Sequence, residues 1–386
     1  MTDVVIAGIG QTPVGEFWDT SLRALGARAI QDAIQDAGGL QPQAIYVGNI
    51  LAGNLSHQAH LATLMADHAG LGGIEAETVE AAGASGGAAL RQGYLAVASG
   101  LVEAVLVLGV EKITDMVGPD VEAALSTVTD GDFEAVQGLT PTSQAALLMR
   151  RYMHEYRVPA DGLAGFPLTA HANGAGNKNA MYRKAISLEA YRKAEAVADP
   201  LNLFDVAPNA DGAAALVLTR RDLLPRDYSH PLVRLSASAA ASDTLAIHDR
   251  PALLSFDAAQ RSARQAFEKA GLAREQVDLF EYHDSFSIFA ALALEAAGFA
   301  EPGQGWKLAA DGSIDLTGQI PCATLGGSKA RGNPGGATGV YQAVEAALQL
   351  RGQAGPNQIA GAKFALTQSV GGAASTVVTH ILERLD

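Results

Sequence analysis

The fold of this chain is decided by the stretch Val79-Glu80-Ala81-Ala82-Gly83-Ala84-Ser85-Gly86-Gly87-Ala88-Ala89-Leu90. It is a run of small residues that opens an apolar helix. The free backbone N–H groups at a helix start favour negative charge, so a cysteine placed there would be biased toward its thiolate. The chain has Gly83 at this point, and glycine has no side chain that could be acylated. We predict that residue 83 lies at the start of a buried helix.

Composition and charge exclude several classes of function. The chain has 386 residues, of which 48% are hydrophobic and 18% charged, and this is typical of a globular protein of two or three domains. A net charge of −14 argues against a nucleic-acid or anionic-membrane surface. No apolar stretch is long enough to cross a bilayer. Nine scattered histidines show no metal-ligand spacing, so no metal site is expected.

The chain's location is predicted from its first residues and its cysteine count. Met1-Thr2-Asp3 runs directly into a strand-like apolar segment, without the pattern of a secretory signal. The one cysteine, Cys322, rules out an internal disulfide framework and fits a reducing compartment. We expect a cytoplasmic protein.

Two segments far apart in the sequence share an order of features: an amphipathic helix, a glycine, a short loop and an apolar strand. They are Ser21–Ile34 with Ala37–Leu40 and Ala44–Val47, and Phe256–Lys269 with Ala270–Leu272 and Val277–Phe280. Two further pairs match in the same order: Asp211–Thr219 with Gly371–Thr379, and Gly86–Leu90 with Gly335–Gly339. Each match alone is weak in a chain rich in alanine and glycine. Their shared order predicts an internal duplication.

The predicted organisation is two α/β halves, residues 1–225 and 230–386. Their strands are short and almost wholly apolar, as sheets covered on both faces require. Between about 113 and 200 polar, proline- and glycine-bearing stretches alternate with short helices such as Ser143–Tyr156. We interpret this region as a loop domain inserted into the first half.

The run around Gly83 resembles the nucleophile loop of thiolases of the sterol-carrier-protein type and the archaeal branch, where a Cys-Ala-Ser-Gly-Gly run starts the helix. The resemblance extends almost end to end, from Gly8–Gly15 onward, with four motifs in the family's order. It implies a duplicated, five-layered α-β-α-β-α fold with a loop domain over the active site. It also implies coenzyme A thioesters as substrates or ligands, with no covalently bound cofactor.

The loop Glu281–Ser287 looks like the family's His-Asp-x-Phe loop. The resemblance implies that His283 helps to bind a thioester oxyanion, directly or through a water, and places Asp284 among the catalytic candidates. An imidazole can donate such a hydrogen bond and can also move a proton near neutral pH. The alternative is a structural histidine that caps a strand end.

The loop Gly326–Gly339 matches the family's Gly-His-Pro-x-Gly-Ala-Thr-Gly, with Asn333 at the histidine position. The resemblance implies that this histidine accepts the cysteine proton and helps to hold the oxyanion. Asparagine can donate a hydrogen bond but cannot act as a base at pH 7.

The last motif, Leu366–Gly372, occupies the position where other thiolases carry an acid/base cysteine. Ser369 is a poor proton donor or acceptor, whereas the amides of Gly371 and Gly372 are candidates for lining an oxyanion pocket or are structural glycines. Cys322 lies in an apolar, β-like stretch, and a buried hydrophobic role is favoured for it over that of a relocated nucleophile.

Covalent acyl-enzyme chemistry needs an activated nucleophile, so ordinary thiolase turnover is expected to be very slow. Three interpretations remain. The chain catalyses cysteine-independent carbon–carbon bond chemistry such as a retro-aldol cleavage, with His283 or Tyr282 as base; it is a non-catalytic acyl-CoA-binding or scaffold subunit; or it is an acetyl-CoA C-acyltransferase with an altered site.

The resemblance also implies partners. It implies a homodimer, or an assembly of dimers, in which the strand around 79–83 pairs across a two-fold axis, and a small zinc-ribbon/OB-fold partner protein. The amide-rich stretch His171–Lys184 is either a border of the substrate channel, with Lys178, Arg183 or Lys184 meeting CoA phosphates, or a surface loop.

Overall fold

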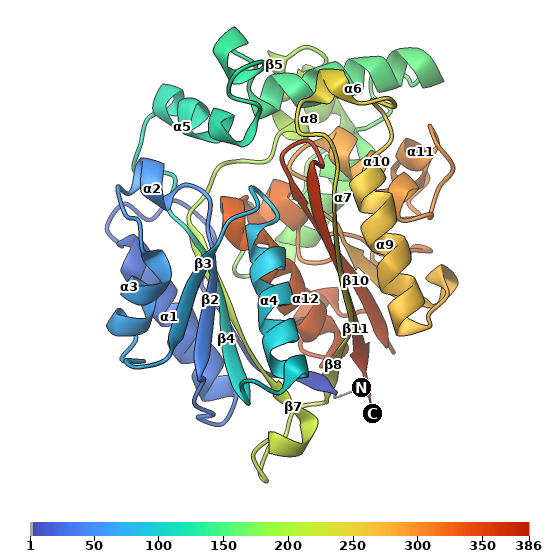
Figure 1. Ribbon diagram of the computed structural model, residues 1–386. Helices are drawn as coiled ribbons and strands as arrows, with labels where there is room; N and C mark the ends of the chain where they lie inside the picture. The colour runs from blue at the N-terminus through green and yellow to red at the C-terminus, as the bar shows by residue number, and fades with distance from the viewer. Residues whose placement is uncertain (1–2, 386) are drawn as a thin grey trace.

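The computed structural model describes residues 3–385 as a layered α/β molecule (Figure 1). The strands are β1 (Val4–Gln11), β2 (Ala44–Gly48), β3 (Glu75–Val79), β4 (Ala104–Glu111), β5 (Ala196–Ala198), β6 (Leu201–Asn202), β7 (Gly212–Arg220), β8 (Val233–Ser242), β9 (Leu279–Glu281), β10 (Phe364–Gly371) and β11 (Thr376–Arg384). The helices are α1 (Leu22–Asp36), α2 (Ala52–Leu55), α3 (Leu61–His68), α4 (Ser85–Ser99), α5 (Gly118–Leu125), α6 (Pro141–Tyr156), α7 (Gly165–Ala175), α8 (Leu188–Lys193), α9 (Asp257–Ala270), α10 (Ser287–Ala296), α11 (Gly305–Ala310) and α12 (Thr338–Leu350).

The order of the strands shows the duplication. The large sheet runs β3-β2-β4-β7-β1-β8-β11-β10-β9, and its two parts meet at a single residue pair between β1 and β8. In both parts two parallel strands lie beside an antiparallel pair. β9 also has an outer neighbour, because Phe280 forms a parallel bridge with Cys322, just as β3 lies outside β2. The two halves therefore repeat one five-strand order.

Helices separate and cover the two parts of the sheet, which gives five layers (Figure 1). α1 and α3 cover the outer face of the first part, and α9 covers the outer face of the second. α4 and α12 lie between the two parts and contact strands of both. This arrangement explains why the apolar strand β4 is fully buried, because helices cover both of its faces.

Glycines allow the two central helices to approach each other closely at their N-terminal ends. A Cβ atom on Gly86 would lie 2.7 Å from the carbonyl oxygen of Gly336, and one on Gly339 would lie 2.3 Å from the backbone nitrogen of Gly87. No side chain fits at these positions. The two glycine-rich segments that match in the sequence are thus the contact between the duplicated helices.

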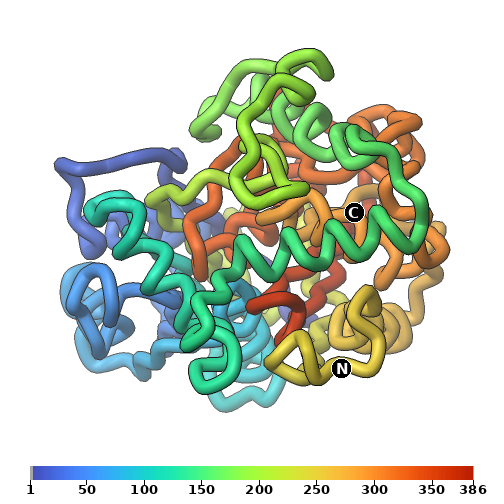
Figure 2. The backbone as a smooth tube through the Cα atoms, turned by 90° about the horizontal axis from the view of Figure 1, so that it is seen from above, coloured from blue at the N-terminus to red at the C-terminus, as the bar shows by residue number. Residues whose placement is uncertain are grey.

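Helices α5, α6 and α8 form an upper layer across the ends of the two parts of the sheet, as the view from above shows (Figure 2), while α7 packs lower down against α10 and α11. The chain enters this layer after β4 and returns before β7. Asp211 joins these two points, since its carboxylate accepts hydrogen bonds from Lys112 Nζ (2.8 Å), the Ile113 backbone (2.7 Å) and Thr114. These bonds outweigh burial and bring the Asp211 pKa below its usual value. The upper layer is therefore anchored where it leaves and re-enters the core.

Two local expectations need correction. The strand expected around 79–83 ends at Val79, and residues 81–84 form a tight turn before α4 begins at Ser85. The stretch 171–184 is not one loop, because its first residues complete α7. No helix within residues 3–385 is long and apolar enough to cross a membrane.

Candidate active site

Gly83, His283 and Asn333 line one cavity beneath the upper layer, here called the inner cavity. Its volume is about 110 Å³. A water molecule in the liquid occupies about 30 Å³, so the inner cavity has room for an acyl group of a few heavy atoms and not for a whole coenzyme. Three predicted site residues, distant in sequence, thus meet at one small space.

Gly83 lies in a rigid turn directly against the opposite half of the molecule. The Ser85 hydroxyl fixes this turn by accepting from the Ala81 backbone (2.9 Å) and donating to the Ala82 carbonyl (2.6 Å). A Cβ atom on Gly83 would lie 2.5 Å from the Val370 carbonyl oxygen and 3.1 Å from His283 Cε1. Any side chain at this position therefore requires the surrounding structure to shift.

His283 is a neutral hydrogen-bond donor in this structure. It is buried, and its Nδ1 accepts a hydrogen bond of 3.4 Å from the Val370 backbone, which leaves the ring proton on Nε2. Burial, and then the nearby positive charge of Arg331, lower the His283 pKa to about 4. The ring is consequently uncharged near neutral pH, and Nε2 lies 3.4 Å from the Cβ position of residue 83. This geometry suits a hydrogen bond to an oxyanion and does not suit a base.

Asn333 supplies a second donor to the inner cavity. Its backbone is held by the carbonyl of Pro208 (3.0 Å) and by the N–H of Ala210 (3.2 Å). Its Oδ1 accepts a hydrogen bond of 3.0 Å from the Thr338 hydroxyl, at the start of α12. This bond orients the amide so that Nδ2 remains for a ligand, because nothing within residues 3–385 accepts a hydrogen bond from it.

Gly372 also lines the inner cavity, whereas Asp284, Ser369 and Gly371 do not. Asp284 is buried, and its Oδ1 accepts a hydrogen bond of 2.6 Å from the Ser328 backbone, so it holds the loop that leads to Asn333. Ser369 donates to Gln342 Oε1 (2.8 Å) inside the core. Gly371 is packed against Ala81. Alternation along β10 explains why Val370 lines the cavity and Ser369 does not, since neighbouring side chains on a strand point to opposite faces.

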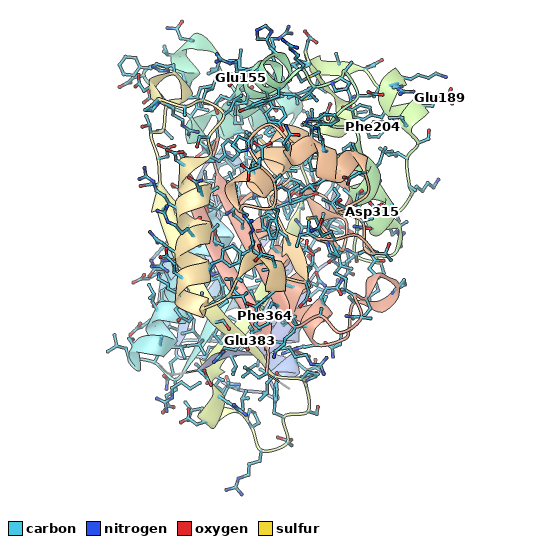
Figure 3. All side chains as sticks on the ribbon, turned by 90° about the vertical axis from the view of Figure 1, so that its right-hand side faces the viewer. Glu155, Glu189, Phe204, Asp315, Phe364 and Glu383 are labelled. Atoms are coloured by element: carbon cyan, nitrogen blue, oxygen red, sulfur yellow. The ribbon has the colours of Figure 1, made fainter. Side chains whose placement is uncertain are left out.

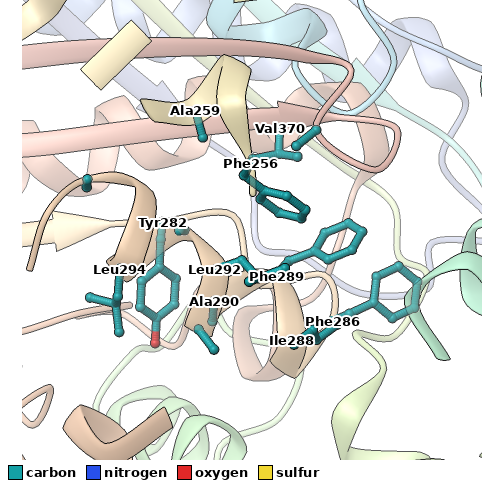
Figure 4. Packing of buried hydrophobic residues seen from close by; sticks show 14 of the residues in the cluster. Phe256, Ala259, Tyr282, Phe286, Ile288, Phe289, Ala290, Leu292, Leu294 and Val370 are labelled. Atoms are coloured by element: carbon teal, nitrogen blue, oxygen red, sulfur yellow. The ribbon is translucent and has the colours of Figure 1, made fainter. Parts of the chain in front are cut away.

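Two further candidates, Tyr282 and Cys322, lie in the hydrophobic core of the second half. The Tyr282 ring packs edge-on against Phe166 and Phe280, and in Figure 4 it lies at the far side of the cluster from Phe286. Burial raises the pKa of Tyr282 and that of the Cys322 thiol well above their usual values. Neither group can serve the inner cavity as base or nucleophile.

Sequence reasoning missed residues that the upper layer brings to the inner cavity, chiefly Glu122 and Leu125 of α5 and Thr142 and Gln144 of α6. No motif marks them.

Sequence reasoning also missed Glu111, whose buried carboxylate accepts hydrogen bonds from Asn49 and from the backbones of Ile50, Leu51 and Gly336. Burial raises the Glu111 pKa to about 7, against the opposing effect of these hydrogen bonds. An acidic residue that ends an apolar strand was the available signal for it.

The inner cavity has an apolar wall opposite its donors. Phe286, Phe289 and Val370 come from the second half, and Leu125 and Val128 come from the upper layer. In Figure 4 the rings of Phe286 and Phe289 lie side by side, and Phe286 is the nearer to the upper layer. The wall suits the hydrocarbon part of an acyl group.

A second space, the outer chamber, adjoins the inner cavity and has a volume of about 540 Å³. The two share the lining residues Val206, Ala207 and Asn209. Phe204, which also lines the outer chamber, lies near the upper end of the molecule in Figure 3, far from Phe364 and Glu383. Among the residues that the structure describes, the lining includes Lys184 and Lys329 and no acidic side chain.

Some residues of the stretch 171–184 line the outer chamber, and others form hydrogen bonds in the protein core. His171, Tyr182 and Lys184 line the outer chamber, and the rings of the first two are stacked with their centroids 5.8 Å apart. The amides of Asn173 and Asn177 instead donate to backbone carbonyls of residues 322–325. Lys178 and Arg183 are exposed and do not line the chamber.

Comparisons with known proteins find similarity along nearly the whole chain. Residues 4–222 match the family model described as "Thiolase, N-terminal domain", and residues 239–384 match "Thiolase C-terminal domain-like". The chain is 44% identical over 386 residues, all of both chains, to a protein named acetyl-CoA acetyltransferase from Methanothermobacter thermautotrophicus. It is 29% identical, over 96% of this chain and 94% of the relative, to the benzoylsuccinyl-CoA thiolase subunit BbsB of Thauera aromatica.

One solved structure, the "Ltp2-ChsH2(DUF35) aldolase", has a TM-score of 0.84 at 24% identity, covering 99% of this chain and 98% of the other. This likeness shows the fold. Together with the two family models and the relative of equal length, it establishes that the chain belongs to the thiolase family.

Proposed function

We propose that the chain binds a CoA thioester and makes or breaks a carbon–carbon bond in its acyl group without forming an acyl-enzyme. The observation that carries this proposal is the pair of neutral donors, His283 Nε2 and Asn333 Nδ2, at a cavity that offers no activated nucleophile. The two lining hydroxyl groups belong to Thr142 and Ser285, and neither has a hydrogen bond to His283 among residues 3–385. The site can therefore stabilise a thioester enolate but cannot be acylated in the family's manner.

The proposed binding mode divides the ligand between the two spaces. The acyl group occupies the inner cavity, with its hydrocarbon part against the apolar wall. The pantetheine arm passes Val206 and Asn209 into the outer chamber. In this binding mode the CoA phosphates lie near Lys184, whose positively charged ammonium group attracts them.

In the cleavage direction the substrate is a β-hydroxyacyl-CoA. A base removes the β-hydroxyl proton, the bond between the α and β carbons breaks, and the bonding pair moves onto the thioester as an enolate. Hydrogen bonds from His283 and Asn333 stabilise the enolate oxygen. A proton added to the α carbon completes a shorter acyl-CoA, and the β carbon leaves as an aldehyde or ketone.

Product analysis tests this proposal. The protein is incubated with β-hydroxyacyl-CoA thioesters of different β substituents, and separately with acetoacetyl-CoA plus free CoA, and the products are identified by liquid chromatography and mass spectrometry. We expect carbonyl products from the first group and no covalent acyl adduct on the protein. Robust thiolysis of acetoacetyl-CoA would contradict the proposal.

A second candidate is a non-catalytic acyl-CoA-binding or scaffold subunit, and the close packing around Gly83 favours it, because the site has no space for the family's nucleophile. We also propose a small zinc-ribbon/OB-fold partner and a homodimer. The aldolase structure of similar fold carries a DUF35 component in its name. Tight binding of CoA thioesters with no conversion of any of them, alone or with such a partner, is the result expected of a scaffold.

A further inference from the structure

We propose that Glu122 is the proton-transfer residue of the inner cavity, which takes the proton from the substrate's β-hydroxyl group and delivers it to the α carbon of the enolate. The inference rests on the proposed function and names the base that this function requires. It assigns chemistry to a residue of the upper layer that belongs to none of the sequence motifs.

Glu122 belongs to helix α5, which lies in the upper layer (Figure 1). Glu122 and Leu125 both line the cavity, and residues three apart share one face of a helix. Val121 and Ala124 are buried on the adjoining face and pack in one cluster with Leu51, Leu55 and Ile113, which fixes the helix on the first half. The carboxylate is thus presented by a packed element rather than by a mobile side chain on the surface.

The contacts of Glu122 leave its carboxylate available. No residue in the range 3–385 forms a hydrogen bond or an ion pair with the side chain, and its partial burial raises the Glu122 pKa above its usual value. Burial is the cause, with no contribution from a neighbouring charge. A carboxylate with these properties is a stronger base than one in water.

The other ionisable groups near the inner cavity already have hydrogen-bond partners. The Nδ1 lone pair of His283 accepts from Val370, and its ring resists protonation. Glu134 accepts hydrogen bonds from Gln144 (2.9 Å) and from the Ile247 backbone (2.8 Å). Glu122 and His283 are the ionisable side chains among the lining residues that the structure describes. Glu122 is therefore the lining group that can accept a proton near neutral pH.

The proposed step is balanced. The Glu122 carboxylate gains the β-hydroxyl proton as the carbon–carbon bond breaks, and the resulting carboxylic acid returns that proton to the α carbon. No oxidant, reductant or metal is consumed. His283 and Asn333 thus stabilise the enolate oxygen, and the Glu122 carboxylate moves the proton.

The test compares Glu122→Gln with Asp120→Asn, a change of an exposed acid on the same helix. Two rates are measured: exchange of the α protons of propionyl-CoA with D₂O, and cleavage of the best β-hydroxyacyl-CoA. We expect Glu122→Gln to lose about 10²- to 10⁴-fold in both rates, with its Kd for propionyl-CoA within threefold of the unmodified protein. Asp120→Asn should keep both rates, and Glu122→Asp should keep a measurable part of the exchange.

The two readouts separate this inference from the proposed function. Exchange that depends on Glu122 without cleavage of any hydroxyacyl-CoA would support Glu122 as the residue that moves the α proton, and would overturn its role at the β-hydroxyl group together with the retro-aldol proposal. Cleavage that survives in Glu122→Gln would overturn the inference and leave the proposal intact. An unmodified protein that binds propionyl-CoA but neither exchanges nor cleaves would overturn both. Circular dichroism and thermal unfolding check that each variant is folded.

Discussion

Gly83 and His283 approach so closely that a Cβ atom on the glycine would lie 3.1 Å from His283 Cε1. The same atom would lie 2.5 Å from the Val370 carbonyl oxygen, and real Cβ atoms essentially never come that near. The turn before α4 thus occupies space that a nucleophilic side chain would need. The packing around residue 83 therefore leaves no room for the cysteine that the sequence lacks at this position.

The first prediction concerns restoration of acyl-enzyme chemistry. Gly83→Cys alone should acylate poorly, because the side chain crowds Val370 and because Asn333 cannot accept the thiol proton. The double variant with Asn333→His should exceed the product of the two single effects, since nucleophile and base act as a unit. Mass spectrometry of an acetyl adduct and acetoacetyl-CoA thiolysis measure this. Gly83→Ser is the size-matched control, and its expected loss of stability is about 1–3 kcal/mol.

The second prediction concerns the oxyanion donors. His283→Ala should lower the rate of α-proton exchange in propionyl-CoA by about 10²- to 10³-fold, the usual cost of removing one such donor. The Kd for propionyl-CoA should change little, because the donor acts mainly on the charge that develops at the oxygen. Asn333→Ala should behave alike. Equal losses in binding and in exchange rate would contradict this assignment and indicate a general packing defect.

The third prediction concerns the outer chamber. Lys184→Gln should raise the Kd for CoA about two- to fivefold, the value of one exposed charge pair. The effect should shrink at high salt, which screens exposed charges. Lys193→Gln is the control, because Lys193 is exposed and pairs with Glu189 on the surface. Titration calorimetry at two ionic strengths makes the comparison, and equal effects of the two variants would argue against CoA in this chamber.

The fourth prediction concerns the stability of the fold at acidic pH. Burial lowers the pKa of His380 to about 4, below its ordinary value of 6.5, so only the unfolded state binds this proton between those values. The stability contributed by the neutral ring is complete above pH 6.5 and is lost as pH falls toward 4. His380→Gln should therefore reduce the slope of unfolding free energy against pH by about 1.4 kcal/mol per unit between pH 4.5 and 6.

Urea unfolding at several pH values measures this slope. Glu111, with its pKa raised to about 7, contributes a slope of opposite sign, but it is present in both proteins and cancels in the comparison. Glutamine at position 380 can still donate to the Gly87 carbonyl, the 3.0 Å partner of His380 Nε2. Identical slopes for the two proteins would show that His380 is protonated in the folded state.

The fifth prediction concerns the outer edge of β3. This strand ends the sheet, and its free edge presents unpaired backbone groups that favour pairing with a second copy. We expect a homodimer at micromolar concentration by light scattering, with β3 amides that exchange slowly with D₂O. A strictly monomeric protein whose β3 amides exchange rapidly would contradict this expectation.

Much of the fold could be predicted from the sequence, because repeated local patterns carry it. The glycine pairs at 86–87 and 335–336 indicated two equivalent helix starts, and the apolar strand β4 indicated a sheet covered on both faces. The meeting of Gly83, His283 and Asn333 followed from motif order. Ser369 and Asp284 were expected at the site from the same order, and neither lines the inner cavity. Motif order does not indicate which face of a strand a side chain uses.

What the sequence by itself determined is the chemistry that is absent: no thiol at residue 83 and no basic group at residue 333, whatever the fold. Only the tertiary structure decided what takes its place. The proton on His283 Nε2 is fixed by a backbone N–H from Val370, and Glu122 reaches the inner cavity because α5 packs over it. Both depend on contacts between segments more than 80 residues apart, or on the packing of one layer upon another, and no local pattern records such contacts.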